Sequence, residues 1–151
     1  MGKVIEQIDG VIVTPLKQIE DKRGAVFHVL RKDSKIFNVF GEVYFSKVNP
    51  GVVKAWKIHK EMTQNFCVPF GNLKLVIYDD RPALATRGII NEFLLNPDTD
   101  YKLITIPPGL WYGFKCVGST YCLLLNIADK VHDPKESSQI SYTDNKIPYK
   151  W

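Results

Sequence analysis

Short apolar runs alternate with turn residues along most of this chain. The runs are rich in Val, Ile, Phe, Tyr and Leu, and clusters of Gly, Pro, Asn and Asp separate them. Short strands at regular spacing with turn signals are typical of a β-sandwich or β-barrel. The predicted strands cover residues 11–15, 25–30, 41–48, 54–58, 63–69, 72–78, 89–95, 101–106, 113–117 and 120–127. We therefore expect an all-β fold.

Length and composition fit one globular domain. The chain has 151 residues, of which 45% are hydrophobic and 24% are charged. A chain of this size buries about two thirds of its unfolded surface, which is enough to support a core. From about residue 132 the strand periodicity is lost and the sequence becomes polar. We predict a single domain over residues 1–151 whose C-terminal tail packs over the barrel.

Charge and cysteine content argue against several classes of protein. The net charge is +4, and the basic residues are interleaved with acidic ones, so nucleic-acid binding is not indicated. Cys67, Cys116 and Cys122 are odd in number and lack metal-type spacing, which favours reduced thiols. No apolar segment approaches about 18 residues, and the N-terminus lacks the apolar stretch of a secretory signal. We expect a cytoplasmic protein without a membrane segment.

His59 has the most suggestive surroundings of the histidines. It follows a predicted strand, with Lys57 and Lys60 close in sequence. Neighbouring positive charges disfavour protonation of an imidazole, and the neutral imidazole is the form that acts as a general base. A lone histidine in a strand is also commonly structural, so the residue alone leaves both interpretations open.

Metal binding in such a barrel would need paired histidines, a carboxylate and a further histidine. Lys57 stands two residues before His59, and the later strand end reads GLWYGF, without a histidine. We therefore expect no metal and no other cofactor. The chain also lacks a Gly-x-Ser-x-Gly motif, a phosphate-binding loop and a dinucleotide fingerprint, which argues against the chemistry that each supports.

Several short motifs follow one another in a specific order. They are Asp21-Lys22-Arg23-Gly24, His59, Gln64, Tyr78-Asp79-Asp80-Arg81, Ile106-Pro107-Pro108-Gly109 with Gly113-Phe114, Tyr142-Thr143-Asp144, and the terminal Ile147-Pro148-Tyr149-Lys150-Trp151. In order and spacing they resemble the dTDP-4-dehydrorhamnose 3,5-epimerase family, within the cupins. The resemblance runs along most of the chain and implies a cupin jelly roll.

The resemblance also implies an activity and a set of site residues. The substrate would be a 4-keto-6-deoxyhexose on a nucleoside diphosphate, used in deoxysugar or polysaccharide biosynthesis. His59 would be the general base, Asp144 the carboxylate that orients it, and Arg23 a contact to the diphosphate, with Gln64 also at the substrate. The enzyme would be a metal-independent homodimer. The C4 ketone acidifies the hydrogens at C3 and C5, so one base can form an enolate.

Three residues of the family pattern are missing. The lysine that the family has shortly after the glutamine is absent, and Phe66 or Cys67 stands in its region. The family's arginine three residues before the histidine is replaced by Trp56, so we expect Lys57 or Lys74 to stabilise the enolate oxygen. The tyrosine that serves the family as general acid would fall near Leu125 or Asn126, and neither carries a phenol.

A phenol from elsewhere is then needed. Tyr112 stands in place of the histidine of the family's H-G-F motif, and Tyr44 lies on another predicted strand. Either is a candidate acid, while Tyr112 is equally interpretable as an aromatic residue packed beside Trp111. His28 stands where the family has a glutamate that helps to read the base, and an imidazole can donate where a carboxylate only accepts. We therefore expect a dTDP or a CDP carrier.

Three functional interpretations remain open from the sequence. The first is an epimerase at C3, C5 or both, or a related ketoisomerase. The second is a non-catalytic cupin that binds nucleotide sugars or carbohydrates, and the third is an unrelated enzyme on the same scaffold. The first two differ in whether His59 and Asp144 meet within hydrogen-bond reach inside a pocket.

Overall fold

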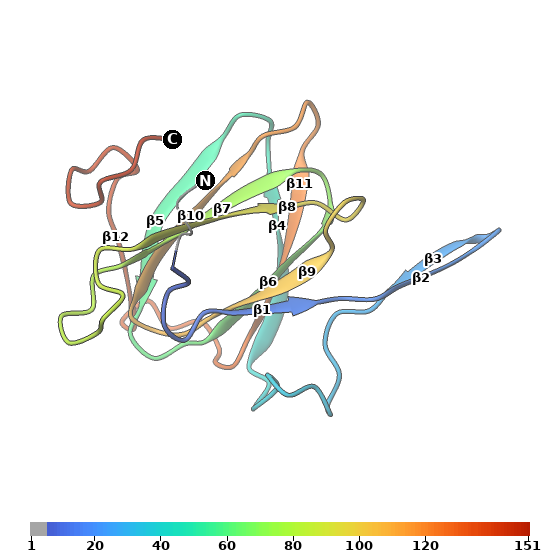
Figure 1. Cartoon of the computed structure of the whole chain (residues 1–151), viewed down its shortest axis with the longest axis horizontal. Helices are drawn as coiled ribbons and strands as arrows, with labels where there is room; N and C mark the ends of the chain where they lie inside the picture. The colour runs from blue at the N-terminus through green and yellow to red at the C-terminus, as the bar shows by residue number, and fades with distance from the viewer. Residues whose placement is uncertain (1–5) are drawn as a thin grey trace.

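Two five-stranded antiparallel sheets face each other and enclose the core (Figure 1). This computed structural model describes residues 6–151; residues 1–5, part of the N-terminal segment considered above, lie outside the described range. The first sheet has the order β1-β9-β6-β11-β4 and the second the order β12-β5-β10-β7-β8. The strands are β1 (Ile12–Pro15), β2 (Gln18–Asp21), β3 (Gly24–Phe27), β4 (Glu42–Val48), β5 (Val53–His59), β6 (Gln64–Phe70), β7 (Leu73–Asp79), β8 (Ile90–Leu95), β9 (Lys102–Ile106), β10 (Leu110–Cys116), β11 (Cys122–Ala128) and β12 (Ser137–Gln139).

Strict alternation of side chains builds the core between the sheets. On β7, Leu73, Leu75 and Ile77 point inward and are fully buried, because successive residues of a strand face opposite sides. Tyr112 and Phe114 of β10 join the same cluster. The predicted all-β architecture is confirmed, although β2 and β12 lie outside the predicted strands.

The tail after β11 covers the outer face of the second sheet. β12 pairs with β5, and Ile147 is buried against Trp56 and Trp111 on that face. Gly113 allows this close packing, since a Cβ there would lie 2.3 Å from the Cβ of Ala55 and 2.9 Å from the ring of Trp151. A side chain at position 113 would therefore push the tail off the sheet.

A bulge in β5 decides which of its residues face inward. Tyr112 pairs with Lys57 and Gly113 with Ala55, so Trp56 has no partner on β10. The Trp56 backbone instead exchanges hydrogen bonds of 2.9 and 3.1 Å with Ile140 of the tail. An extra residue shifts the alternation by one position. Ala55 and Trp56 both pack on the outer face, and Lys57 returns to the inner face.

The hairpin of β2 and β3 projects from the body of the molecule (Figure 1). Its apolar residues Ile19 and Val26 are exposed over more than half of their surface. None of residues 6–151 forms a helix with the length and hydrophobicity that crossing a bilayer requires.

Candidate active site

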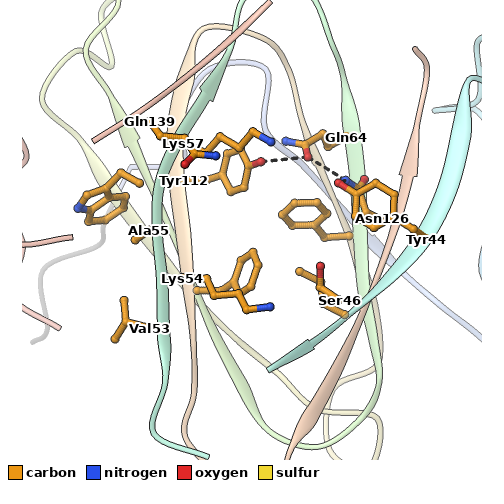
Figure 2. Close-up of a pocket in the computed structure, with 14 residues that line it drawn as sticks. Tyr44, Ser46, Val53, Lys54, Ala55, Lys57, Gln64, Tyr112, Asn126 and Gln139 are labelled. Carbon is orange, nitrogen blue, oxygen red and sulfur yellow. Dashed lines mark hydrogen bonds between the residues drawn. The ribbon is translucent and has the colours of Figure 1, made fainter. Parts of the chain in front are cut away.

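A cavity of about 320 Å³ lies between the two sheets (Figure 2). Phe66, Phe114 and Leu124 give it an apolar wall. Its polar groups come from six strands of both sheets: Tyr44 and Ser46 of β4, Lys54 and Lys57 of β5, Gln64 of β6, Tyr112 of β10, Asn126 of β11 and Gln139 of β12. A hollow in which polar groups from several strands converge beside an apolar wall is a common form of small-molecule site.

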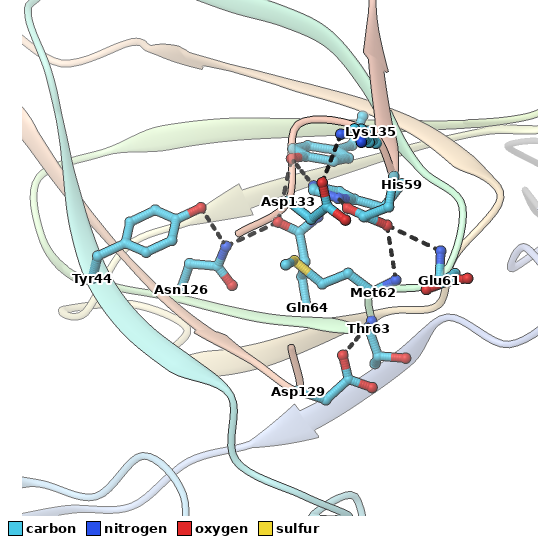
Figure 3. Close-up of polar contacts among 12 residues, drawn as sticks. Tyr44, His59, Glu61, Met62, Thr63, Gln64, Asn126, Asp129, Asp133 and Lys135 are labelled. Atoms are coloured by element: carbon cyan, nitrogen blue, oxygen red, sulfur yellow. Dashed lines mark hydrogen bonds and ion pairs between the residues drawn. The ribbon is translucent and has the colours of Figure 1, made fainter. Parts of the chain in front are cut away.

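His59, labelled in Figure 3, forms a buried pair with Glu136 and lies beside Tyr112, which lines this cavity. His59 Nδ1 is hydrogen-bonded to Glu136 Oε1, and Glu136 Oε2 accepts from the backbone N–H groups of Glu61 (3.1 Å) and Met62 (3.2 Å). The pairing of Ser137 with His59 in β12 and β5 brings the carboxylate there. Three hydrogen bonds fix the Glu136 side chain, so the imidazole ring that it contacts is also held in orientation.

The charges of the pair follow from its surroundings. Burial lowers the pKa of His59, electrostatic interactions with Lys57 and His132 act in the same direction, and the contact with Glu136 offsets this only in part. Burial alone would raise the pKa of Glu136, but its hydrogen bonds from His59 and from two backbone N–H groups hold that pKa below its usual value. These shifts favour a neutral imidazole that donates Nδ1–H to an ionised carboxylate, which leaves Nε2 free to accept a proton.

A row of hydrogen bonds runs from Nε2 along the cavity wall (Figures 2 and 3). The Tyr112 hydroxyl lies 3.2 Å from His59 Nε2 and 3.2 Å from Gln64 Oε1. Asn126 Nδ2 donates to Gln64 Oε1 and to the Tyr44 hydroxyl, each at 2.9 Å. The row thus places one phenol on each sheet. His59, only 4% exposed, is not among the lining residues, so Tyr112 stands between it and the cavity.

Comparison with known proteins identifies the family. No family model matches the chain. A relative described as a probable low-salt glycan biosynthesis epimerase, Agl13 of Haloferax volcanii, is 34% identical over 144 residues, which cover 94% of this chain and 88% of the relative. The crystal structure of a dTDP sugar isomerase from Desulfovibrio desulfuricans G20 is 42% identical, with a TM-score of 0.93 over 95% of this chain and 92% of that one. The chain belongs to the dTDP-4-dehydrorhamnose 3,5-epimerase-like family of cupins.

A more distant member shares the fold of this epimerase-like cupin. The 3,5-epimerase of Legionella pneumophila Philadelphia 1, solved with dTDP-4-keto-L-rhamnose, is 21% identical with a TM-score of 0.85, over 98% of this chain and 81% of that one. The predicted cupin jelly roll and the predicted family are therefore confirmed.

Four of the predicted site residues of this epimerase-like cupin come together. Lys57, Gln64 and Tyr112 line the cavity, and His59 contacts Tyr112. Tyr44, the second candidate acid, also lines it. The alternation of β5 alone would not have placed Lys57 there, since the placement depends on the bulge at position 56.

Asp144 does not lie beside His59. It is exposed in the tail, where its Oδ1 accepts from the backbone N–H of Lys146 at 2.8 Å. The pairing of Ile140 with Trp56 carries the chain onto the outer face of the second sheet, away from the cavity. The orienting role that the sequence analysis gave to Asp144 is therefore corrected, since Glu136 makes that contact.

Three predicted substrate contacts also lie outside the cavity. Lys74 points to the outer face, with its Nζ 5.3 and 5.4 Å from the ring centres of Tyr149 and Trp151, because the inward positions of β7 are its odd-numbered residues. Arg23 is at the exposed tip of the hairpin and pairs with Asp21 at 2.6 Å. His28 lies at the base of the hairpin, where its backbone N–H donates to Lys17 at 2.9 Å.

Glu136 was missed because no local pattern links it to His59. Asp133-Pro134 does indicate a turn: Asp133 Oδ1 accepts from Lys135 N at 2.9 Å, and Glu136 N donates to Asp133 O at 3.1 Å. That signal predicts a chain reversal just before an acidic residue, but not its contact 77 positions away. Within residues 6–151, no three His, Cys, Asp or Glu residues gather in a group that could hold a metal ion.

Proposed function

We propose that this chain is an epimerase or isomerase of a 4-keto-6-deoxyhexose carried on a nucleoside diphosphate, in deoxysugar or polysaccharide biosynthesis. The proposal rests on the His59–Glu136 pair: His59 Nε2 contacts the phenol of Tyr112, which lines a cavity of about 320 Å³. The Legionella relative was solved with a ligand of this class, which supports the choice of substrate.

Proton removal would begin at the second sheet. The hydrogens at C3 and C5 are acidified by the C4 ketone, and a base near the wall can take one of them. Because Tyr112 separates His59 from the cavity, its hydroxyl would turn from Gln64 Oε1 to His59 Nε2, pass its proton there and take the substrate proton on its oxygen. Glu136 stabilises the imidazolium that forms. Burial raises the pKa of Tyr112, so a free phenolate is avoided and the two transfers are coupled.

Proton return would come from the first sheet. Tyr44 projects from β4 and contacts Asn126 of β11, the position at which the family's tyrosine is absent. Epimerisation needs removal on one face of the carbon and return on the other. Two phenols on opposing sheets meet that need, so we assign the acid role to Tyr44.

Lys57 would stabilise the enolate oxygen, and no metal is required for that step. The β5 bulge turns Lys57 into the cavity, which Lys54 also lines, and the amides of Gln64 and Asn126 face Lys57 from the first sheet. Fixed positive charge and hydrogen-bond donors in a water-poor site are effective stabilisers of a developing oxyanion.

The projecting hairpin supports a homodimer. Its exposed Ile19 and Val26 would be covered by a second copy, together with Val43 and Phe45 of the edge strand β4. Arg23 at the hairpin tip would then reach the diphosphate bound to that second copy. His28, where the hairpin joins the barrel, would contact the nucleobase. We therefore propose dTDP or CDP as the carrier.

Turnover and binding measured together test the proposal. The protein is titrated with dTDP- and CDP-linked 4-keto-6-deoxyglucose by calorimetry, and the products are then identified by proton NMR. We expect saturable binding and a product inverted at C3 or C5, or with the keto group moved to C3. Binding of either compound without any product would identify a binding module instead, and binding of neither would remove the substrate class.

A further inference from the structure

Two cysteines from opposite sheets meet in the hydrophobic core. Cys116 ends β10 of the second sheet, and Cys122 begins β11 of the first. Their Sγ atoms are 2.8 Å apart, and both residues are fully buried. A disulfide bond is about 2.05 Å long, so the sulfur atoms need to approach by less than about 1 Å to be joined.

We propose that Cys116 and Cys122 form a site of reversible covalent modification, at which oxidation produces a disulfide that joins the two sheets. The inference does not rest on the proposed function. Each sulfur is already held in place, since Cys116 Sγ donates to Thr120 O and Cys122 Sγ to Asn72 O, both at 3.1 Å. Gly71 makes room for the pair: a Cβ there would lie 2.8 Å from the Cα of Cys122 and 3.0 Å from its Sγ.

Cys67 provides an internal comparison. It is also fully buried, but it packs with Tyr101 and Leu103 in a separate cluster that contains no other cysteine. Burial raises the pKa of Cys67 to about 11 and that of Cys122 to about 12, so neither thiol is rich in thiolate at neutral pH. Cys116 and Cys122 differ from Cys67 in that each has a second sulfur atom in contact with its own. The site is therefore suited to a slowly formed, stabilising link.

Hydrogen peroxide is a small oxidant that balances the reaction. One sulfur, as a thiolate, attacks a peroxide oxygen; the O–O bond breaks, and a sulfenic acid and water result. The second sulfur then attacks the sulfenic sulfur, the S–S bond forms and the hydroxyl leaves as water. Two thiols together lose two electrons and two protons, and one peroxide becomes two waters.

The link would stiffen one end of the cavity. Phe114 lies two residues before Cys116 and Leu124 two residues after Cys122, and both line the apolar wall. The closed loop is short, so its constraint on the unfolded chain is moderate, and oxidation should raise the Tm by roughly 5 °C.

Peptide mapping tests the link directly on the full-length wild-type protein. After peroxide treatment the protein is denatured, its free thiols are alkylated, and it is digested with trypsin. The tryptic peptide 116–130 contains both cysteines and lacks Cys67. We expect this peptide to be unalkylated and two hydrogen atoms lighter than its reduced form. Further cleavage after Tyr121 should give two fragments that separate only on reduction.

Two variants distinguish disulfide formation between Cys116 and Cys122 from non-specific oxidation of the cysteines. Cys67→Ser should keep both the lighter peptide and the gain in Tm, whereas Cys116→Ser should lose both and leave Cys122 alkylated. Alkylation of both cysteines in the treated wild-type protein would overturn the proposal, as would their independent oxidation to sulfinic or sulfonic acids. The wild-type mass measurement decides the question even if a variant fails to fold.

Discussion

The Nδ1 atom of His59 is hydrogen-bonded to Glu136, a carboxylate that lies 77 positions later in the chain. A three-residue strand, β12, joins the edge of the second sheet and places the two side chains together. The Nε2 atom of His59 contacts the Tyr112 hydroxyl, and His59 itself does not line the cavity. The proposed proton transfer thus depends on a C-terminal segment whose sequence shows no strand pattern.

Glu136 should matter to turnover far more than Asp144. In the Glu136→Gln variant the amide keeps the size of the side chain but cannot stabilise an imidazolium, so kcat should fall on the order of 100-fold with little change in KM. The matched Asp144→Asn variant should behave as wild type, because Asp144 contacts only the tail. Equal losses in the two variants would return the orienting role to Asp144 or assign it to neither.

The pH dependence should have an acid limb set by His59. Its pKa is lowered by burial and, further, by Lys57, so the active neutral form persists below the ordinary value of 6.5. The kcat/KM should fall only as the pH drops through that lowered pKa. The free energy of unfolding depends on pH in the same direction. The lowered pKa of His59 contributes its full stabilisation above the pKa of His59 in the unfolded chain, and this contribution is lost as the pH falls through the pKa in the folded protein.

Lys57→Met should move this limb to higher pH, since it removes one cause of the lowered pKa. Lys74→Met, on the outer face, is the matched control and should leave the profile unchanged. An acid limb above pH 6.5 in the wild-type protein would contradict the neutral-base assignment.

The two phenols should have separable effects. Tyr112→Phe breaks the link between His59 and the cavity, so both deuterium exchange at the substrate carbon and product formation should be lost. Tyr44→Phe leaves that link intact, so exchange should continue while formation of the inverted product falls at least about 100-fold. Both quantities are followed by NMR in D2O. Full exchange in Tyr112→Phe would mean that His59 acts on the substrate directly.

Gly113→Ala should destabilise the fold. The added Cβ would meet Ala55 and Trp151 within 3 Å, and such overpacking costs about 1–3 kcal/mol of the free energy of unfolding. Gly118→Ala is the control, because its Cβ would have no neighbour closer than 3.5 Å, and it should change stability by less than about 0.5 kcal/mol. Urea unfolding measures both. Equal stability of Gly113→Ala and wild type would show that the tail does not pack tightly on the sheet.

The strand-like alternation of apolar and polar residues predicted most of the fold, but it missed particular strands. The alternation in β7 is why that strand was predicted over 72–78, whereas β10 was predicted only from residue 113, so its first three residues were missed. β12 has three residues, partly or fully exposed, and no apolar alternation, so only its pairing with β5 defines it as a strand. β2 is largely exposed and lies within the projecting hairpin, where no core-facing pattern is needed.

Site residues could be predicted from the sequence where the pattern of a single strand fixes their position. They could not be predicted where the position depends on how distant strands pair. Gln64 lies in the predicted strand 63–69 and faces inward on β6, whereas Tyr112 precedes the predicted strand 113–117 and was singled out by its motif. Lys57 depends on the bulge at Trp56, which period-two reasoning does not foresee. Glu136 depends on long-range pairing, and the tail from residue 132 also contains Asp133 and Asp144. A short motif match therefore favoured Asp144, which the tail carries to the opposite face.

The measurement that tests the central claim most directly is deuterium incorporation into a bound 4-keto-6-deoxy nucleotide sugar in D2O, followed by proton NMR for wild type and His59→Gln. We predict incorporation at C3 or C5 with the wild-type protein, and a rate at least about 100-fold lower in the variant although the ligand still binds. Incorporation at the same rate in both proteins, or none in the wild type with the ligand bound, would contradict the assignment of His59 as the base.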